Sequence, residues 1–258
     1  VMRITVLLLS ALLNVVFCGC ATNPVTGQNE LRLVSNVQEV EMGSRIDAQV
    51  RTQYAVITGT PEADRVARIG ARIANVSDRR NITYHFALID SGELNAFAAP
   101  GGFIYVTSEL VRVSGDDAEL ASVMAHEVGH VAAYHSVHQV QRALGYELFK
   151  ALIFAESKSP EAETAADIAF NNILMTGFSR EDEYQADTLG VTYSARAGYD
   201  PYGLANFFVK LQKREGAGVN DRTFEFLMSH PNTADRRRRA EAEAAKYVGG
   251  ATSGPRSI

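Results

Sequence analysis

Residues 121–135 read ASVMAHEVGHVAAYH, and the fold that we expect for the chain follows from the two histidines in this segment. On a helix, residues four positions apart lie one above the other, so His126 and His130 present both imidazoles to one side. Two imidazoles placed in this way can hold one Zn²⁺ at about 2.0–2.1 Å from each nitrogen. Glu127 lies beside the pair and can take a proton from a metal-bound water, because the metal lowers the pKa of that water to about 7. The neighbouring residues are mostly apolar, which argues against two histidines on a solvent-facing helix.

A catalytic zinc of this kind needs a third protein ligand and keeps its fourth position for water. The candidate lies in SREDEYQADTLG, residues 179–190, where Glu183 and Asp187 are four positions apart and share one helix face. Glu183 could bind the metal while Asp187 orients a ligand imidazole from behind. The spacing alone leaves an alternative open, in which the acidic residues 181–183 form a solvated helix face.

The remaining pattern predicts an α+β fold that is mainly α-helical, with a small antiparallel sheet beside the motif helix. Strands are expected over residues 83–90, 94–99 and 103–107. Further helices are expected over residues 31–54, from Pro61 to about Asn75, and over 180–197, 201–213 and 233–247.

The helix that carries the histidine motif is expected to run from residue 116 to about Leu144. Ser114 and Asp117 fit a capping box at its start. On this helix His135 and His138 point away from the face of the histidine pair, so they are expected to be structural or exposed. Charged residues interrupt the segment 145–178 too often for a membrane span, and we expect it to form a lid over the histidine motif.

The overall composition restricts the class of protein. The chain has 258 residues, of which 46% are hydrophobic and 21% charged, and these values suit one medium-sized globular domain. A chain of this length can bury a sufficient core without disulfides. The formal net charge of −5 gives no sign of a surface for phosphate groups, so no nucleic-acid partner is expected.

The first twenty residues predict a targeting signal. They read VMRITVLLLSALLNVVFCGC, and their apolar run is too short to span a bilayer comfortably. A buried core helix is the alternative. Gly19-Cys20 resembles the cleavage site of a bacterial lipoprotein, which makes Cys20 the candidate for lipidation. By the same resemblance Ala21, in place of Asp, favours the outer membrane. Lipid chains would hold the protein on the membrane without a transmembrane helix.

Three motifs in a fixed order carry a family resemblance. HEVGH at 126–130, SREDEYQAD at 179–187 and MSHPNTADR at 228–236 resemble the motifs of the HtpX/BepA/LoiP-like zinc metallopeptidases. This is a gluzincin family shared with the CAAX prenyl proteases, and the N-terminal pattern resembles its periplasmic lipoprotein members. The resemblance implies a zincin-like core and assigns Glu183 as the third ligand of one Zn²⁺ per chain.

The resemblance also assigns supporting residues. Asp187 and Arg236 are expected to contact the metal ligands on the side that faces away from the metal. His230 is expected to be catalytic, either by stabilising the oxyanion or by approaching the zinc and holding the enzyme inactive. The residues alone favour an alternative, in which His230 lies in the turn at the N-terminus of a helix, before Pro231.

A further similarity concerns the stretch NAFAAPGGFIYV, residues 95–106, which resembles the family's segment beside the active site. A strand in that place can bind a peptide by edge addition, using main-chain hydrogen bonds. Asn95, Ala96 and Phe97 are therefore predicted to bind substrate. An ordinary hairpin is the alternative.

The sequence pattern and the resemblance together predict a division of the chain into a signal peptide (1–19), a lipidated linker (20–30), a zinc metallopeptidase domain (31–248) and a disordered tail (249–258). The implied function is that of a zinc-dependent endopeptidase of the bacterial envelope, located in the periplasm and anchored to the outer membrane. Its implied substrates are unfolded or misassembled envelope proteins. The alternative is a chaperone, assembly factor or latent protease that binds clients with little cleavage. Glu127 argues against a purely binding role, because binding alone needs no general base.

Overall fold

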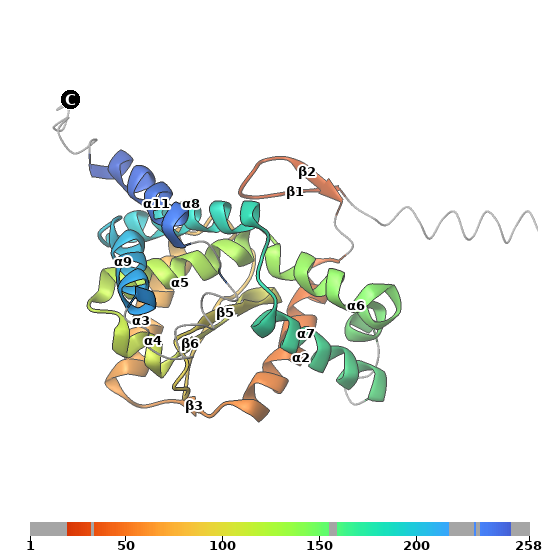
Figure 1. Cartoon of the computed structure of the whole chain (residues 1–258). Coiled ribbons are helices and arrows are strands. Elements are labelled where there is room, and N and C mark those ends of the chain that lie inside the picture. The colour runs from red at the N-terminus through yellow and green to blue at the C-terminus, as the bar shows by residue number, and fades with distance from the viewer. Residues whose placement is uncertain (1–19, 32–33, 155–158, 217–229, 231–232, 249–258) are drawn as a thin grey trace, which may run out of the picture.

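The computed structural model describes residues 20–31, 34–154, 159–216, 230 and 233–248. Within these ranges the chain is mostly helical, and the helices surround a small sheet (Figure 1). This arrangement confirms the mainly α-helical α+β fold. The strands are β1 (Cys20–Thr22), β2 (Asn29–Leu31), β3 (Val56–Ile57), β4 (His85–Ile89), β5 (Ala96–Ala99) and β6 (Phe103–Thr107). The helices are α2 (Asn36–Gln53), α3 (Pro61–Val76), the 3₁₀ turn η1 (Pro100–Gly102), α4 (Ser108–Val113), α5 (Asp117–Ala132), α6 (His135–Phe154), α7 (Pro160–Met175), α8 (Arg180–Arg196), α9 (Gly203–Gly216) and α11 (Thr233–Val248).

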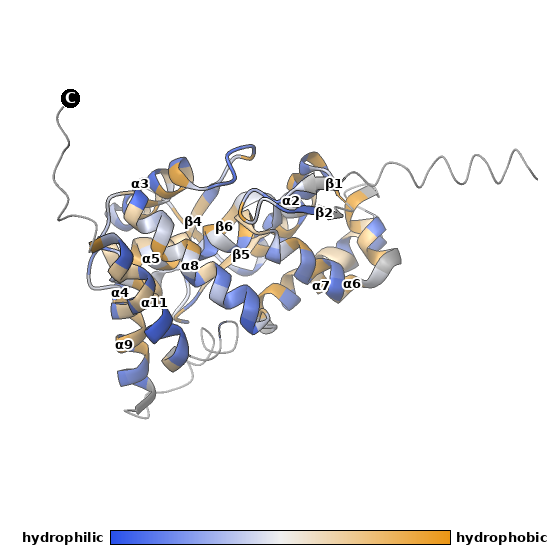
Figure 2. Ribbon diagram, turned by 90° about the horizontal axis from the view of Figure 1, so that it is seen from above, coloured by the Kyte–Doolittle hydropathy of each residue, from blue (hydrophilic) through white to orange (hydrophobic). Residues whose placement is uncertain are grey.

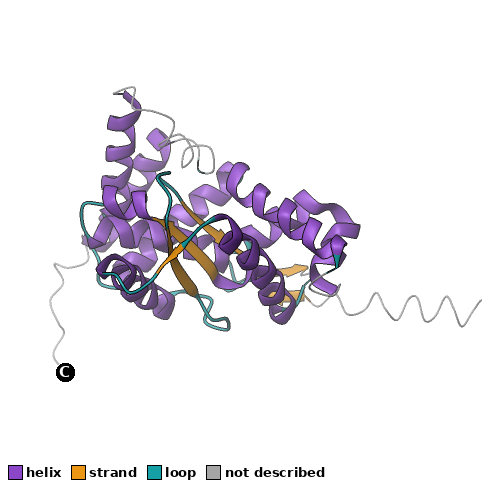
Figure 3. Ribbon diagram, turned by 90° about the horizontal axis from the view of Figure 1, so that it is seen from below, coloured by secondary structure: helices purple, strands orange, loops and turns teal. Residues whose placement is uncertain are grey.

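The larger sheet has the strand order β3-β4-β6-β5, with β5 at one edge. Figure 3 shows its strands in orange among the helices. Strand β6 lies in the middle: it pairs antiparallel with β5 and parallel with β4, where His85 pairs with Phe103 and Ile89 with Thr107. The sheet is therefore mixed, whereas the sequence pattern predicts an antiparallel one. The difference arises because η1 joins β5 directly to β6, while the chain between β4 and β5 crosses to the far side of β6.

The side chains of β5 and β6 alternate between two hydrophobic cores, because neighbouring residues of a strand point to opposite faces. Ile104 and Val106 belong to the larger core, which includes residues of α3, α5, α8 and α9. Phe97 and Tyr105 belong to the second core, which includes residues of α2, α6 and α7. Helices α6 and α7 lie at the opposite end of the molecule from α9 and α11 (Figure 2). The described part of segment 145–178 thus contributes to a core, and its function as a lid stays a prediction.

The helix that carries the histidine motif, α5, begins one residue later than expected and with a different cap. The N-cap is Asp116, whose side chain accepts a hydrogen bond from the backbone N–H of Glu119. Ser114 instead follows α4, a short helix that the sequence pattern does not predict. Its hydroxyl donates to the carbonyl of Leu110 at 2.8 Å. The predicted capping box is therefore wrong, although the predicted helix start is nearly right.

Helix α5 also ends much earlier than the predicted boundary near Leu144. Its last residue is Ala132, and Tyr134 has a φ of 63°, in the left-handed region that interrupts a helix. The next helix, α6, begins at His135. The predicted single helix is thus two helices, and this break decides where His135 lies.

The N-terminal part of the described chain is a hairpin. Strands β1 and β2 pair antiparallel, with Cys20 opposite Leu31, so the segment expected to be a linker (20–30) contains regular structure. The expected signal peptide (1–19) and disordered tail (249–258) lie outside the described residues. Among the helices that the structure describes, none combines the length and the apolar character needed to cross a membrane.

Candidate metal centre

Helices α5 and α8 approach each other closely, and two glycines allow it. A Cβ atom added at Gly129 of α5 would lie 3.1 Å from the Cβ of Leu189. A Cβ added at Gly190 of α8 would lie 3.1 Å from the backbone nitrogen of His126. Any larger residue at these positions would push the helices apart. The close contact brings Glu183, in the first turn of α8, to the two histidines of α5.

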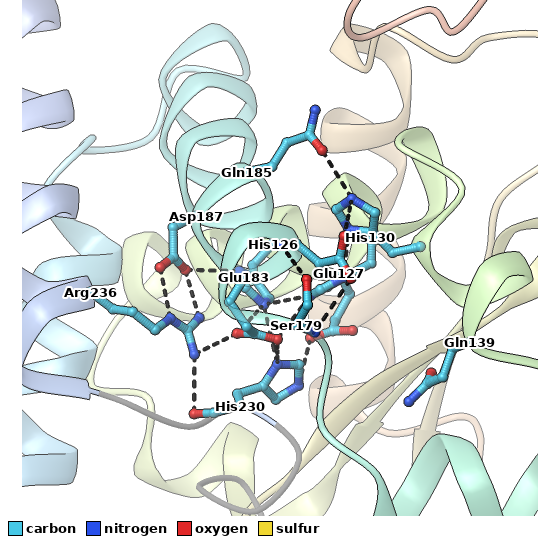
Figure 4. A network of polar contacts seen from close by, with 12 residues as sticks. His126, Glu127, His130, Gln139, Ser179, Glu183, Gln185, Asp187, His230 and Arg236 are labelled. Atoms are coloured by element: carbon cyan, nitrogen blue, oxygen red, sulfur yellow. Dashed lines mark hydrogen bonds and ion pairs between the residues drawn. The ribbon is translucent and has the colours of Figure 1, made fainter. Parts of the chain in front are cut away.

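Four buried donor groups converge at this contact (Figure 4). They come from His126, His130, Glu183 and His230, and their donor atoms all lie within 4.8 Å of one another. The Nε2 atoms of His126 and His130 are 3.0 Å apart. The Nδ1 of His230 lies 3.3 Å from Nε2 of His126 and 2.9 Å from Oε1 of Glu183. Oε1 of Glu183 is 3.5 Å from Nε2 of His130.

The arrangement fits a tetrahedral metal ion. Donor atoms placed about 2.0–2.2 Å from such an ion lie about 3.3–3.6 Å from one another, close to the separations found here. Three imidazole nitrogens and one carboxylate oxygen form a donor set typical of zinc and of other borderline metals. The cluster can therefore hold a metal ion.

Two further buried residues hold the donors in place from behind. Oδ1 of Asp187 lies 3.0 Å from Nδ1 of His126, the nitrogen that faces away from the cluster. Arg236 of α11 makes a two-point contact with Asp187, at 2.6 and 2.7 Å. The same guanidinium lies 2.6 Å from Oε2 of Glu183 and donates to the carbonyl of His230 at 3.1 Å. Arg236 thus connects a carboxylate donor, a supporting carboxylate and the backbone of the fourth donor (Figure 4).

Comparison of the sequence with known proteins identifies the family to which the chain belongs. The model of peptidase family M48 matches residues 61–244, which include both helices that supply the cluster. The chain belongs to peptidase family M48. This membership confirms the class of enzyme predicted from the sequence, a metalloendopeptidase.

Curated relatives of this M48 peptidase are named as proteases or metalloendopeptidases. The chain is 32% identical to the Beta-barrel assembly-enhancing protease of Escherichia coli (strain K12) over 231 residues, which cover 85% of this chain and 47% of that protein. It is 28% identical to the protein of the same name from Yersinia pestis, over 81% of this chain and 44% of the relative. It is 31% identical to the Mitochondrial metalloendopeptidase OMA1 of Arabidopsis thaliana, over 62% of this chain and 31% of the relative. The M48 chain spans about half the length of the first two relatives.

The electrostatics of three of the four donor residues suit metal binding, whereas in the fourth, His230, burial opposes the charge but the carboxylates of Glu183 and Glu127 raise the pKa. Burial alone would raise the pKa of Glu183, but Arg236 and His230 beside it hold that pKa well below its usual range. Burial lowers the pKa of both His126 and His130, the latter strongly. The carboxylate is therefore charged and the two imidazoles are neutral, which are the protonation states that bind a metal.

Glu127 lies in the same cluster but supplies none of the four donor atoms. Neither of its carboxylate oxygens has a hydrogen-bond partner among the described residues, and Nε2 of His230 lies 3.5 Å from one of them. Burial raises the pKa of Glu127 to about 8. The positive charge of a bound cation lowers the pKa of a nearby carboxyl, so metal binding would favour the ionised form that accepts a proton.

His135 lies in a different place from the one that the sequence pattern predicts. Because α5 ends at Ala132, His135 turns back toward the cluster, and its Nδ1 lies 3.0 Å from Nδ1 of His130. Its expected orientation away from the histidine pair is therefore wrong, whereas its burial agrees with the alternative that it is structural and not exposed. His138 is exposed, in agreement with the expectation.

Phe178 is a residue of the site that the sequence analysis did not identify. Its ring stacks on the imidazole of His130, with ring centres 3.8 Å apart and planes 21° from parallel. Phe178 directly precedes Ser179, the N-cap of α8. An apolar residue directly before an N-cap commonly packs against the start of its helix. The position of Phe178 before Ser179 could therefore have indicated that its ring lies close to Glu183 and the metal centre.

The predicted substrate strand is β5, and it lies at the edge of the sheet. The side chains of Asn95, Ala96 and Phe97 are all buried. The ring of Phe97 stacks on Tyr105 at 4.9 Å in the second core, so it points away from the metal centre. The main chain of these three residues is covered as well, so any contact of this segment with a substrate requires that the covering groups move aside.

Proposed function

We propose that this M48 peptidase is a zinc-dependent endopeptidase in which His126, His130 and Glu183 hold one Zn²⁺. The convergence of these buried donors, with the carboxylate of Glu127 beside them, supports the proposal. A bound zinc supplies a Lewis acid that polarises the peptide carbonyl and makes a bound water acidic. Glu127 would act as the general base, which takes a proton from the attacking water and delivers it to the leaving amine.

The position of His230 supports a resting state that is closed. Its Nδ1 stands among the donors, where a catalytic zinc keeps its fourth position for water. Its carbonyl accepts a hydrogen bond from Arg236, which fixes the backbone there. In this proposal, His230 leaves the fourth position when a substrate enters, and it can then face the oxyanion that forms. The enzyme is thus a latent protease that a client opens.

The replacement of His230 by alanine tests this latch. Because the variant cannot occupy the fourth position, we expect faster cleavage of casein, on the order of tenfold if about a tenth of the resting enzyme is open. The matched control is His138→Ala, which removes an exposed histidine of α6 and should leave the rate unchanged. A fall of about 100-fold or more would contradict the latch and would assign His230 to the stabilisation of the oxyanion.

The main chain of β5 supports substrate binding by edge addition. The carbonyl of Asn95 accepts a hydrogen bond from the N–H of Thr107, so this pair is bonded across the two strands. In an antiparallel pair the bonded residues alternate with residues whose main-chain groups face away. The N–H and C=O groups of Ala96 and Ala98 therefore point to the side of β5 on which the structure describes no further strand. Both residues are buried, so an extended peptide can pair with them only after the groups that cover this edge move aside. Such binding depends little on side chains, which suits a protease that acts on unfolded chains.

The proposed setting is the bacterial envelope. It is supported by the name of the bacterial relatives, Beta-barrel assembly-enhancing protease, and by the lipoprotein-like pattern before Cys20. In this setting the protein is held in the periplasm, on the outer membrane, by lipid chains on Cys20. Its substrates are unfolded or misassembled envelope proteins, and its role is quality control.

Metal removal tests the proposed enzyme as a whole. We expect one zinc per chain in protein purified without chelators, loss of casein cleavage after treatment with 1,10-phenanthroline, and its return when zinc is added. Added Mg²⁺ serves as the control, because it prefers oxygen donors and should not restore cleavage. The absence of zinc from the purified protein would contradict the proposal. Bound zinc with no cleavage under any condition would favour the alternative of a chaperone or assembly factor.

A further inference from the structure

The two histidines of α5 are supported from behind by different kinds of residue. Each turns its Nε2 to the donor cluster and its Nδ1 away from it. Nδ1 of His126 faces the carboxylate of Asp187 at 3.0 Å, an arrangement common in metal sites. Nδ1 of His130 instead faces a third imidazole, that of His135, at 3.0 Å.

The contact between His130 and His135 allows only one assignment of protons if His130 binds a metal. A metal on Nε2 of His130 requires that its proton sit on Nδ1. Nδ1 of His135 must then accept that proton in a hydrogen bond, so it carries none itself. The proton of the neutral His135 ring is therefore on Nε2, which lies 3.0 Å from Oε1 of Gln185, an amide oxygen that can only accept. The separations and the chemistry of all three residues agree with this single assignment.

We propose that His135 is a positioning residue for the metal ligand His130. In its neutral form it accepts a hydrogen bond from Nδ1–H of His130 and donates one from Nε2–H to Gln185. This fixes the tautomer and the ring orientation in which Nε2 of His130 faces the metal. The inference rests on the proposed metal site, and it adds a residue and a function that the proposed reaction does not include.

The surroundings of the three residues support this function. Phe178 stacks on one face of the His130 imidazole, so the plane of the ring is held while His135 fixes the direction of its nitrogens. His135 and His130 are 3% and 0% exposed, so water is poorly placed to replace the hydrogen bond. Gln185 lies on α8, two residues after the donor Glu183, so the same helix supplies a metal ligand and the end of the chain of hydrogen bonds.

Zinc affinity, measured on the purified full chain by competition with a fluorescent chelator, tests the inference. In His135→Ala the Nδ1–H of His130 loses its buried acceptor, and we expect zinc to bind about 10–100-fold more weakly. In His135→Asn the amide oxygen stands close to the place of the lost Nδ1 and can accept the same hydrogen bond. We expect that variant to bind zinc within about threefold of the wild type, because the acceptor is restored. His138→Ala, an exposed histidine of the same helix, should bind zinc as the wild type does.

The outcomes separate the inference from the proposed function. Equal zinc affinity in the wild type and His135→Ala would overturn the positioning function while leaving the zinc site in place. Equal weakening in His135→Ala and His135→Asn would also overturn it, because loss of packing and not loss of the acceptor would then explain the effect. Failure of the wild type itself to bind zinc would instead refute the proposed function. Thermal unfolding of the zinc-free variants identifies any variant that fails to fold. If His135→Ala does not fold, the zinc affinity of His135→Asn still tests the positioning function, because this variant keeps the acceptor.

Discussion

Glu127→Gln is expected to lower the rate of casein cleavage about 10²–10⁴-fold while zinc stays bound at one ion per chain. Glutamine has the shape of glutamate but cannot take a proton from water, so the variant lacks the general base. Zinc should remain because Glu127 supplies none of the four clustered donor atoms. The measurement is the cleavage rate at saturating casein together with the zinc content. Glu62→Gln, at an exposed position in the first turn of α3, is the matched control.

The thermal stability of the same variant shows whether activity is lost because the general base is missing or because the protein unfolds. The folded-state pKa of Glu127 is about 8, above the ordinary value of 4.5, so in the metal-free protein ionisation of this carboxyl opposes folding. Its unfavourable contribution grows as the pH rises from about 4.5 toward 8. We therefore expect the metal-free variant to unfold at a temperature no lower than the wild type at pH 8. Undiminished cleavage by a zinc-loaded Glu127→Gln protein would show that another residue takes the proton.

The residues of the proposed metal site could be predicted because the pattern that marks each pair of them is local in the sequence. His126 and His130 are one helical turn apart, as are Glu183 and Asp187, and a single turn of helix places each pair on one face. The start of α3 at Pro61 follows from equally local rules, since proline suits the first turn of a helix. Periodicity could not show that the two turns face each other. That step needed the family resemblance, and the structure explains it by the close packing of α5 on α8.

The break between α5 and α6 could not be predicted, because its cause is distant in the sequence. Tyr134 adopts a positive φ, which is unfavourable for a residue with a Cβ. The guanidinium of Arg79 lies over the Tyr134 ring, 4.1 Å from its centre, and donates to the carbonyl of Val131 in the last turn of α5. Arg79 is itself buried and paired with Glu39 of α2 at 2.6 Å. These contacts stabilise the break, and no pattern within the segment around Tyr134 contains them. The position of His135 beside His130 follows from the same break.

Replacing Arg236 by leucine is expected to destabilise the metal-free protein by about 3–5 kcal/mol, because the change leaves buried charges without a partner. Arg236 contacts both Glu183 and Asp187, and all three side chains are almost fully buried. The run of arginines in α11 offers a matched control in Arg238→Leu. The Arg238 side chain is 71% exposed and forms a surface ion pair with Asp235, so its loss should change the free energy of unfolding by less than about 1 kcal/mol. Urea denaturation with EDTA present measures both.

The pH dependence of the Arg236→Leu effect identifies its cause. Burial opposes the charge of Asp187, but Arg236 holds its folded-state pKa below the ordinary value of 3.8, so this carboxylate stabilises the wild type above that pH and loses the effect in acid. Without Arg236, burial should raise the pKa of the same carboxyl, so the variant should lose stability as the pH rises. The difference between the two proteins should therefore be larger at pH 7.5 than at pH 5. Added zinc should recover part of it, because a bound cation replaces the positive charge next to Glu183. A difference that is small, or that is the same at both pH values, would mean that Arg236 contributes mainly by packing and not by its charge.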